Sequence, residues 1–258
     1  HHGEIAMFAN LDFDVIRRSL PYLFLDGMTF TLMLTGLAAL GGLVFGTLIA
    51  LMRLSSYRLL GRIAGLYVDF MRSLPLVLVI FWFYFLVPYI GQWVTGASRP
   101  IRVGAFTSTL VTFIMFEAAY FSEIMRAGIQ SISKGQPAAA NALGLTYAQT
   151  MRYVVVPQAV RRVVAPLLND FIGLQKDTAL VQILGLVDAF NASRGIAANA
   201  FNLSAVTIVA ILFVLVTIPH GEEARREAAV RGLQVEVALV FPHRGDQDRT
   251  GQGEVLLA

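Results

Sequence analysis

The sequence predicts an all-α polytopic membrane protein with about five transmembrane helices. Of the 258 residues, 56% are hydrophobic and only 14% are charged, and the mean hydropathy of +0.66 is outside the usual range of soluble chains. A helix needs about 20 apolar residues to cross a hydrocarbon core of about 30 Å, and several runs here reach that length. The runs lack the alternation of strands, so we expect helices.

The predicted spans follow one another along most of the chain. Pro21 and Asp26 precede the first span and Arg53 closes it, while the second begins near Gly61. Residues 1–21 form an N-terminal segment, of which 1–6 precede the first methionine and are interpreted as non-native or upstream sequence. The membrane domain is residues 22–219. The predicted spans are residues 27–52, 61–98, 103–130, 157–188 and 195–219.

Lysine and arginine are concentrated on one side of these spans, which the positive-inside rule makes cytoplasmic. This places the N-terminus outside and the C-terminus inside. The cytoplasmic set is Arg53, Arg58, Arg62, Arg126, Lys134, Arg152, Arg161 and Arg162. The outer set is Arg17, Arg18, Arg99, Arg102 and Arg194.

Small residues at helical spacing in the first span predict close helix packing. Gly36, Gly42 and Gly46 lie at such spacings, and the last two form a G-x-x-x-G pair. We interpret the pair as packing within this chain, with helix dimerisation as the alternative.

The cytoplasmic loop at residues 135–158 predicts two short helices joined by a glycine corner. Pro137 suits a first helical turn, and Gly144 suits the left-handed residue that ends a helix, so the first helix is residues 137–143. Thr146 and Gln149 match a capping box that starts the second helix, which we expect Pro157 to interrupt. A surface helix with small side chains can bind in a groove of another protein. The alternative is that the loop has a purely structural role.

The spacing of three groups of residues in this loop resembles that of a known family. Ala138-Ala139-Ala140, then Gly144, then Val154-x-Val156-Pro157 resembles the EAA loop of permease subunits of binding-protein-dependent ABC importers. The resemblance extends over residues 11–219. This part of the chain is similar to the polar amino acid permeases. Within them, RSLPLVLVIFWFYFLVP (72–88) and MFEAAYFSEIMRAGIQSISKGQ (115–136) resemble the glutamate/aspartate branch.

The resemblance implies that this chain is a transport subunit and not an enzyme. It implies a cytoplasmic ATPase dimer that holds ATP and Mg²⁺, and this chain has no G-x-x-x-x-G-K-[ST] phosphate cradle and no expected cofactor or metal of its own. It also implies a second homologous permease, with a heteromer favoured over a homodimer, and a periplasmic or lipid-anchored substrate-binding protein. The expected location is the bacterial inner membrane, in contact with lipid and with no nucleic-acid partner.

The same resemblance assigns ATPase coupling to the cytoplasmic loop. The implied coupling residues are Gly135, Gln136, Pro137, Ala138, Ala139, Ala140, Leu143, Gly144, Thr146, Tyr147 and Pro157. Ala138 stands where the family usually has Glu, so coupling is expected to rest on shape and on neighbouring polar groups. The polar tail, residues 220–258, also departs from the family, and either a shifted reading frame or a genuine, disordered tail explains it.

Ionisable groups inside spans are costly and therefore candidates for a translocation path. Arg72 suits an acidic substrate, but Asp69, one turn earlier, is an alternative partner. Glu123 and Arg126 form either a local ion pair or a gate contact with the partner permease. The candidates are Asp69, Arg72, Glu117, Glu123, Gln175, Lys176, Asp177, Thr178 and Gln182.

The expected substrates are the acidic amino acids glutamate and aspartate. Glutamine, arginine or histidine is the alternative, and an ATP-independent secondary transporter is a further one, against which the absence of an internal repeat argues. An intramembrane enzyme lacks its parts, because the chain has no cysteine and its histidines lie outside the spans.

Overall fold

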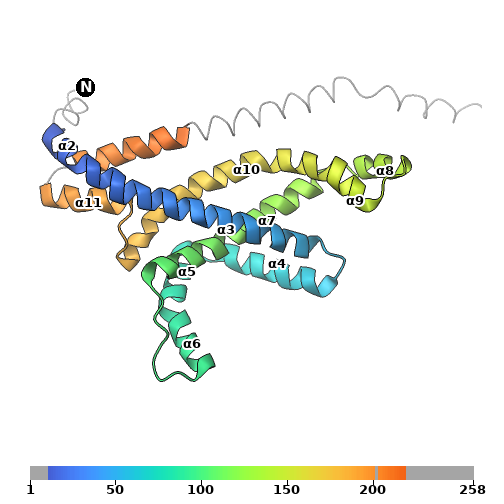
Figure 1. The fold of residues 1–258 in the computed structure, drawn as a ribbon, viewed down its shortest axis with the longest axis horizontal. Helices are drawn as coiled ribbons and strands as arrows, with labels where there is room; N and C mark the ends of the chain where they lie inside the picture. The colour runs from blue at the N-terminus through green and yellow to red at the C-terminus, as the bar shows by residue number, and fades with distance from the viewer. Residues whose placement is uncertain (1–10, 201–202, 219–258) are drawn as a thin grey trace, which may run out of the picture.

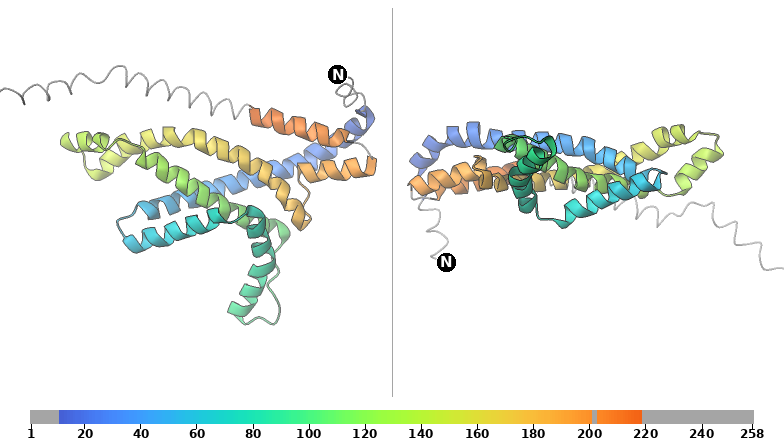
Figure 2. Two further views of the ribbon diagram at one scale, coloured as in Figure 1. Left: turned by 180° about the vertical axis from the view of Figure 1, so that it is seen from behind. Right: turned by 90° about the horizontal axis from the view of Figure 1, so that it is seen from below.

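The computed structural model describes residues 11–200 and 203–218. Every regular element within this part is a helix, which confirms the predicted all-α class. Figure 1 shows the helices running largely along one long axis, and Figure 2 shows from below that they form a flat arrangement. The segment 1–6, Pro219 and the tail 220–258 lie outside the described residues.

The first helix begins much earlier than the predicted span. It runs without a break through α2 (Phe13–Tyr22), a π-helical turn (Leu23–Met28) and α3 (Thr29–Leu54). Asp12 caps its start by accepting hydrogen bonds from the N–H groups of Asp14 and Val15. Pro21 was expected to precede this helix but lies inside it, separated by one residue from the π-helical turn.

The second predicted span is two helices and not one. The first, α4 (Arg58–Ser73), ends where Leu74 adopts an extended conformation before Pro75. Proline disfavours the helical conformation in the residue before it and has no N–H to donate. A new apolar helix then runs through α5 (Leu76–Phe81), a π-helical turn (Trp82–Leu86) and α6 (Val87–Thr95). Asp69 and Arg72 therefore lie on α4, apart from this apolar helix.

The third predicted span forms one continuous helix, α7 (Ala105–Gln130), which packs along α3. A Cβ on Gly42 would lie 2.7 Å from Glu117 Cβ, and one on Gly46 would lie 2.8 Å from Phe121 Cβ. The glycine pair therefore packs within this chain, as interpreted. Gly36 has nothing within 4 Å of its hypothetical Cβ and takes no part in this contact.

Beyond α7 the chain forms the short helix α8 (Gly135–Ala142) and then one long helix. That helix comprises α9 (Tyr147–Thr150), a π-helical turn (Met151–Val155) and α10 (Val156–Asp177), and a 3-10 segment follows (Thr178–Leu184). Pro157 does not interrupt it as expected, because Pro157 lies in the first turn of α10, after the π-helical turn.

The fifth predicted span is divided between α11 (Ala189–Ala200) and an apolar helix over Ser204–Ile218. Within the described ranges, three helices are long and apolar enough to cross a membrane, namely Phe13–Leu54, Leu76–Thr95 and Ala105–Gln130. The charged α10 is not among them. The count of five spans and the orientation of the termini stay predictions.

The main core lies where α3, α4, α5, α7 and α10 meet. Leu34, Val68, Ile80, Phe113 and Leu174, one from each helix, are at most 1% exposed. Elsewhere the apolar helices expose many large side chains, which suits a lipid environment.

Candidate functional site

The corner between α8 and α9 has a defined backbone geometry. Gly144 has φ +83°, a left-handed conformation that favours glycine. Its N–H donates to the carbonyl of Asn141 at 2.9 Å, and the N–H of Leu145 donates to the carbonyl of Ala140 at 3.2 Å. This pair of bonds is a Schellman motif. The prediction that Gly144 ends the first helix is confirmed, although α8 begins at Gly135 and not at Pro137.

The second short helix starts with the predicted capping box. The Thr146 hydroxyl accepts from the N–H of Gln149, and the Gln149 side chain accepts from the N–H of Thr146 at 2.8 Å. Both bonds are local, so the residues at these positions determine them without help from the rest of the fold.

The corner is fastened to the helices on either side of it. Ala140, on α8, is only 5% exposed, and α8 packs against the π-helical turn Met151–Val155. Ile132, Val155 and Ala159 form a small apolar cluster in this region. The Thr150 hydroxyl donates to Asn141 Oδ1 at 3.1 Å and so joins the α9 side to α8. In Figure 1 this unit forms the end of the molecule farthest from α11.

The outer side of the corner is free for contact with another protein. Leu143 is 82% exposed and Tyr147 is 79% exposed, and the small side chains of Ala138 and Ala139 are exposed beside them. Of the other predicted coupling residues, Gln136 accepts a long hydrogen bond of 3.5 Å from Gln158 Nε2. Gly135, Thr146 and Pro157 are exposed, and Pro137 is half-buried.

A second polar group lies deeper, between α4, α7 and α10. Glu117, on α7, is only 4% exposed, and Glu117 Oε2 and Asp170 Oδ2, on α10, are both buried without a hydrogen-bond partner among the described residues. The guanidinium of Arg72, on α4, lies 5.4 Å from the ring centre of Tyr120 and acts electrostatically on Asp170. Asp177 completes this group, which we call the buried acidic group: Glu117, Asp170 and Asp177.

Asp170 and Tyr120 were not among the predicted site residues. Asp170 is an acidic residue within the fourth predicted span, residues 157–188. The acidic residues of that span indicated that one of them could belong to the site. Which of them lies near Glu117 depends on how α7 and α10 pack.

The two predicted ion pairs have different outcomes. Among the described residues, no ion pair joins Asp69 and Arg72, so the alternative in which Asp69 neutralises Arg72 is not seen in this structure. Arg72 lies instead over Tyr120. The local pair of Glu123 with Arg126 is confirmed, and Arg53 on α3 binds the same carboxylate.

The polar residues around the end of α10 do not share one environment. Gln175 is 1% exposed and Thr178 is fully buried, and the Thr178 hydroxyl donates to the Gln175 carbonyl at 2.7 Å. Lys176 is exposed. Gln182 accepts from Arg194 at 2.6 Å. The structure therefore scatters these residues and does not bring them to one surface.

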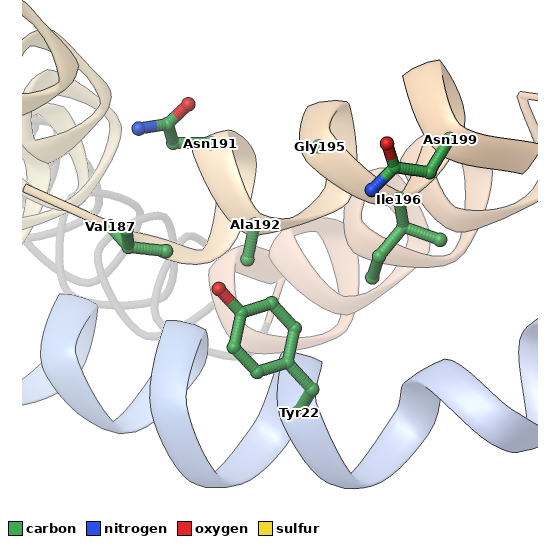
Figure 3. A pocket seen from close by; sticks show the side chains of 7 residues that line it. All are labelled: Tyr22, Val187, Asn191, Ala192, Gly195, Ile196 and Asn199. Carbon is green, nitrogen blue, oxygen red and sulfur yellow. The ribbon is translucent and has the colours of Figure 1, made fainter. Parts of the chain in front are cut away.

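A pocket of about 400 Å³ lies between α2 and α11. Figure 3 shows the ring of Tyr22 facing Ala192 and Ile196, with the amides of Asn191 and Asn199 at its edge. None of the predicted path residues lines this pocket.

Comparison with known proteins identifies the class to which this fold belongs. Residues 42–219 match the family described as binding-protein-dependent transport system inner membrane component, and the chain belongs to that family. It is 49% identical to the glutamate/aspartate import permease protein GltK of Escherichia coli O157:H7 over 185 residues, which cover 72% of this chain and 82% of that protein.

More distant relatives extend the comparison. The chain is 33% identical to the probable glutamine ABC transporter permease protein GlnM of Bacillus subtilis (strain 168) over 198 residues, 76% of this chain and 88% of the relative. A crystal structure of an amino acid ABC transporter with histidines matches with a TM-score of 0.72 and 32% identity, over 83% of this chain and 96% of that chain. The chain is thus a permease of the amino acid ABC importers.

Proposed function

We propose that this chain helps to form the path by which acidic amino acids, glutamate and aspartate, enter the cell. The observation that carries the proposal is the 49% identity to a glutamate/aspartate permease over 185 residues. Glutamine, arginine or histidine is the alternative substrate class, since a glutamine permease is a more distant relative. An ATP-independent carrier is not supported, because the matching family is one of binding-protein-dependent systems.

The substrate is tested by uptake into vesicles that contain the complete transporter. The chain is expressed with the genes beside its own, and the purified assembly is supplied in turn with binding protein and labelled glutamate, aspartate, glutamine, arginine or histidine. We expect ATP-dependent uptake of the two acidic amino acids. Uptake of only glutamine or arginine would refute the acidic substrate while leaving the importer class intact.

Energy would reach this chain through the α8–α9 corner. In the proposed complex, a cytoplasmic ATPase dimer holding ATP and Mg²⁺ receives α8 in a surface groove. The exposed Leu143 and Tyr147, together with Ala138 and Ala139, provide a contact surface. Because Ala138 has no carboxylate, the contact depends on shape and apolar area and not on an ion pair at this position.

A matched pair of tyrosines tests this coupling surface. Tyr147, in the corner, is 79% exposed and Tyr57, between α3 and α4, is 77% exposed. Tyr147→Asp should leave membrane insertion unchanged but abolish the ATPase activity that loaded binding protein stimulates, whereas Tyr57→Asp should have little effect. Equal ATPase activity in the two variants would refute the role of the corner.

The path itself is expected to form between this chain and a second permease, with the binding protein delivering the amino acid from outside. A heteromer is our proposal, and the exposed apolar faces of the helices provide area for such a partner as well as for lipid. Mass measurement of the assembly purified in mild detergent tests it: two different permease chains support the heteromer, and one kind of chain refutes it.

Among the path candidates, Arg72 has the most suitable surroundings. It is an exposed cation of this chain that borders the buried acidic group. A substrate carboxylate would be attracted to its guanidinium, which presents several N–H donors in a planar fork. The remaining candidates, Asp69, Glu117, Glu123, Gln175, Lys176, Asp177, Thr178 and Gln182, are proposed only as neighbours of this path.

A further inference from the structure

The last turn of α7 lies against the first half of α10, close to the α8–α9 corner (Figure 1). Gly128 is buried there, and a Cβ on it would lie 2.2 Å from Val163 Cγ1 and 3.5 Å from the Ala159 carbonyl oxygen. Val163 and Ala159 are each 4% exposed. The absence of a side chain at Gly128 therefore allows the two helices to touch at this point.

A second contact lies one turn further along the chain from Gly128. Ser131 is the residue that ends α7, and its carbonyl oxygen accepts a hydrogen bond from Arg162 Nη1 on α10. The last carbonyl groups of a helix have no partner inside it, so a cation at this end is favourable. Arg162 and Val163 are consecutive, so both contacts hold the same turn of α10. We call Gly128, Ser131, Arg162 and Val163 the α7–α10 clamp.

The corner is attached on both sides of this clamp. On one side, only residues 131–134 separate α7 from α8. On the other side, α9 continues through the π-helical turn into α10 without a break. Ile132, Val155 and Ala159 pack together between the two attachments. These short connections leave α8 little freedom to move without the helices that carry it.

We propose, given the coupling role of the corner proposed above, that the clamp makes the corner, the end of α7 and the start of α10 move as one body. Arg162 is the positioning residue that keeps the two helices together during this motion. A force on α8 then displaces both helices at once and does not slide α10 along α7. Glu117 and Asp170 lie further along the same two helices, so the displacement reaches the buried acidic group from both sides.

A disulfide across the clamp tests the common motion. The chain has no cysteine, so an introduced pair is the only one within it. A Cβ on Gly128 would lie 3.7 Å from Val163 Cβ, and disulfides have Cβ–Cβ distances of about 3.5–4.5 Å. Replacing Val163 also removes the Cγ1 atom that crowds Gly128.

The double variant Gly128→Cys, Val163→Cys is compared in its oxidised and reduced forms within the complete transporter. Alkylation and mass spectrometry count the thiols that remain. We expect the disulfide to form and uptake to stay within about twofold of the reduced form, because a bond inside a body that moves as one removes no required motion. Val163→Cys alone is the control for the oxidant and should respond to neither treatment.

Arg162→Gln provides a second readout that does not depend on the packing at Gly128, because Arg162 is exposed. The loss of one charge-assisted hydrogen bond should lower uptake per ATP hydrolysed by about fivefold, and Arg162→Lys, which keeps a cationic donor, should lose less. Oxidising the cysteine pair in the Arg162→Gln background should restore the ratio, because the disulfide then joins the same two turns. A contact of Arg162 with another chain would not be replaced in this way.

Four results would overturn the clamp. The disulfide does not form; it forms and abolishes uptake that a reducing agent restores; Arg162→Gln keeps the wild-type ratio; or oxidation leaves the ratio of Arg162→Gln low. Each of them leaves ATP-dependent uptake by the wild-type transporter, and with it the proposed function, intact. The role of the corner itself is judged separately, by the variants of Tyr147 and Tyr57.

Discussion

Arg53, at the end of α3, donates a hydrogen bond to Glu123 on α7 and so joins two residues that are 70 positions apart in the chain. Glu123 also binds Arg126, so one carboxylate pairs with two arginines. All three side chains are only partly exposed, so water screens the pair weakly. The ends of α3 and α7 nearest the α8–α9 corner are therefore held together by charge.

Glu123→Gln should destabilise the permease, because it leaves Arg53 and Arg126 facing each other without a counter-charge. We expect a loss of about 1–3 kcal/mol, between the values for surface and buried pairs. The loss of folded protein on heating in detergent measures it. Arg53→Gln is the control and should cost less, since Glu123 then keeps Arg126; an equal or larger loss in the control would contradict this account.

Gly46→Ala should weaken the contact between α3 and α7. The added Cβ would lie 2.8 Å from Phe121 Cβ and 2.9 Å from the Ala118 carbonyl oxygen, so the helices must separate. Overpacking of this kind costs about 1–3 kcal/mol. Gly36→Ala, on the same helix but with open space at its Cβ, should leave thermal stability unchanged or slightly raised. Similar stability of the two variants would exclude the close contact at Gly46.

Gly144→Ala should disturb the corner that presents α8. A left-handed conformation costs a residue with a Cβ about 1–2 kcal/mol. This cost lowers the equilibrium constant between the native corner and other conformations by a factor of about 5–30. We expect reduced uptake with normal membrane insertion, and loss of uptake in Gly144→Asp. Gly96→Ala, which changes another left-handed glycine at the end of α6, outside the corner, is the control and should keep uptake. Unchanged uptake in Gly144→Asp would mean that the corner geometry does not matter for transport.

Arg72→Gln should lower uptake by about tenfold or more, because it removes the cation beside Tyr120 and Asp170. Lys176→Gln is a matched loss of one positive charge at an exposed position on α10 and should have a small effect. Initial uptake rates of glutamate in vesicles compare the two. A larger loss in Lys176→Gln would transfer the proposed role from Arg72 to Lys176.

The helical breaks show where local sequence rules were insufficient. Proline was expected to limit helices at Pro21 and Pro157, yet both lie inside continuous helices next to π-helical turns. Pro75, which was placed within a span, is the proline that separates two helices. A proline only removes one donor and crowds one turn; whether the helix continues depends on how the neighbouring segments pack around it.

The candidate site was predictable to the extent that its interactions are local. The corner at Gly144 and the capping box of Thr146 and Gln149 were both expected, because each is formed by residues within a few positions of one another. The local pair of Glu123 and Arg126 was expected for the same reason. The role of the corner in coupling, by contrast, stays a proposal about a partner.

The amino-acid sequence by itself determined the class of the molecule, because the length and apolarity of its runs require helices in a membrane. It also determined the family, since the loop spacing and the segments around it were enough for the resemblance that the comparisons then confirmed. The tertiary structure decided which charges meet. Arg53 reaches Glu123, and Arg72 lies over Tyr120 and does not pair with Asp69. These contacts join separate helices, and their geometry follows from glycine-mediated packing between distant segments, which spacing along the chain does not specify.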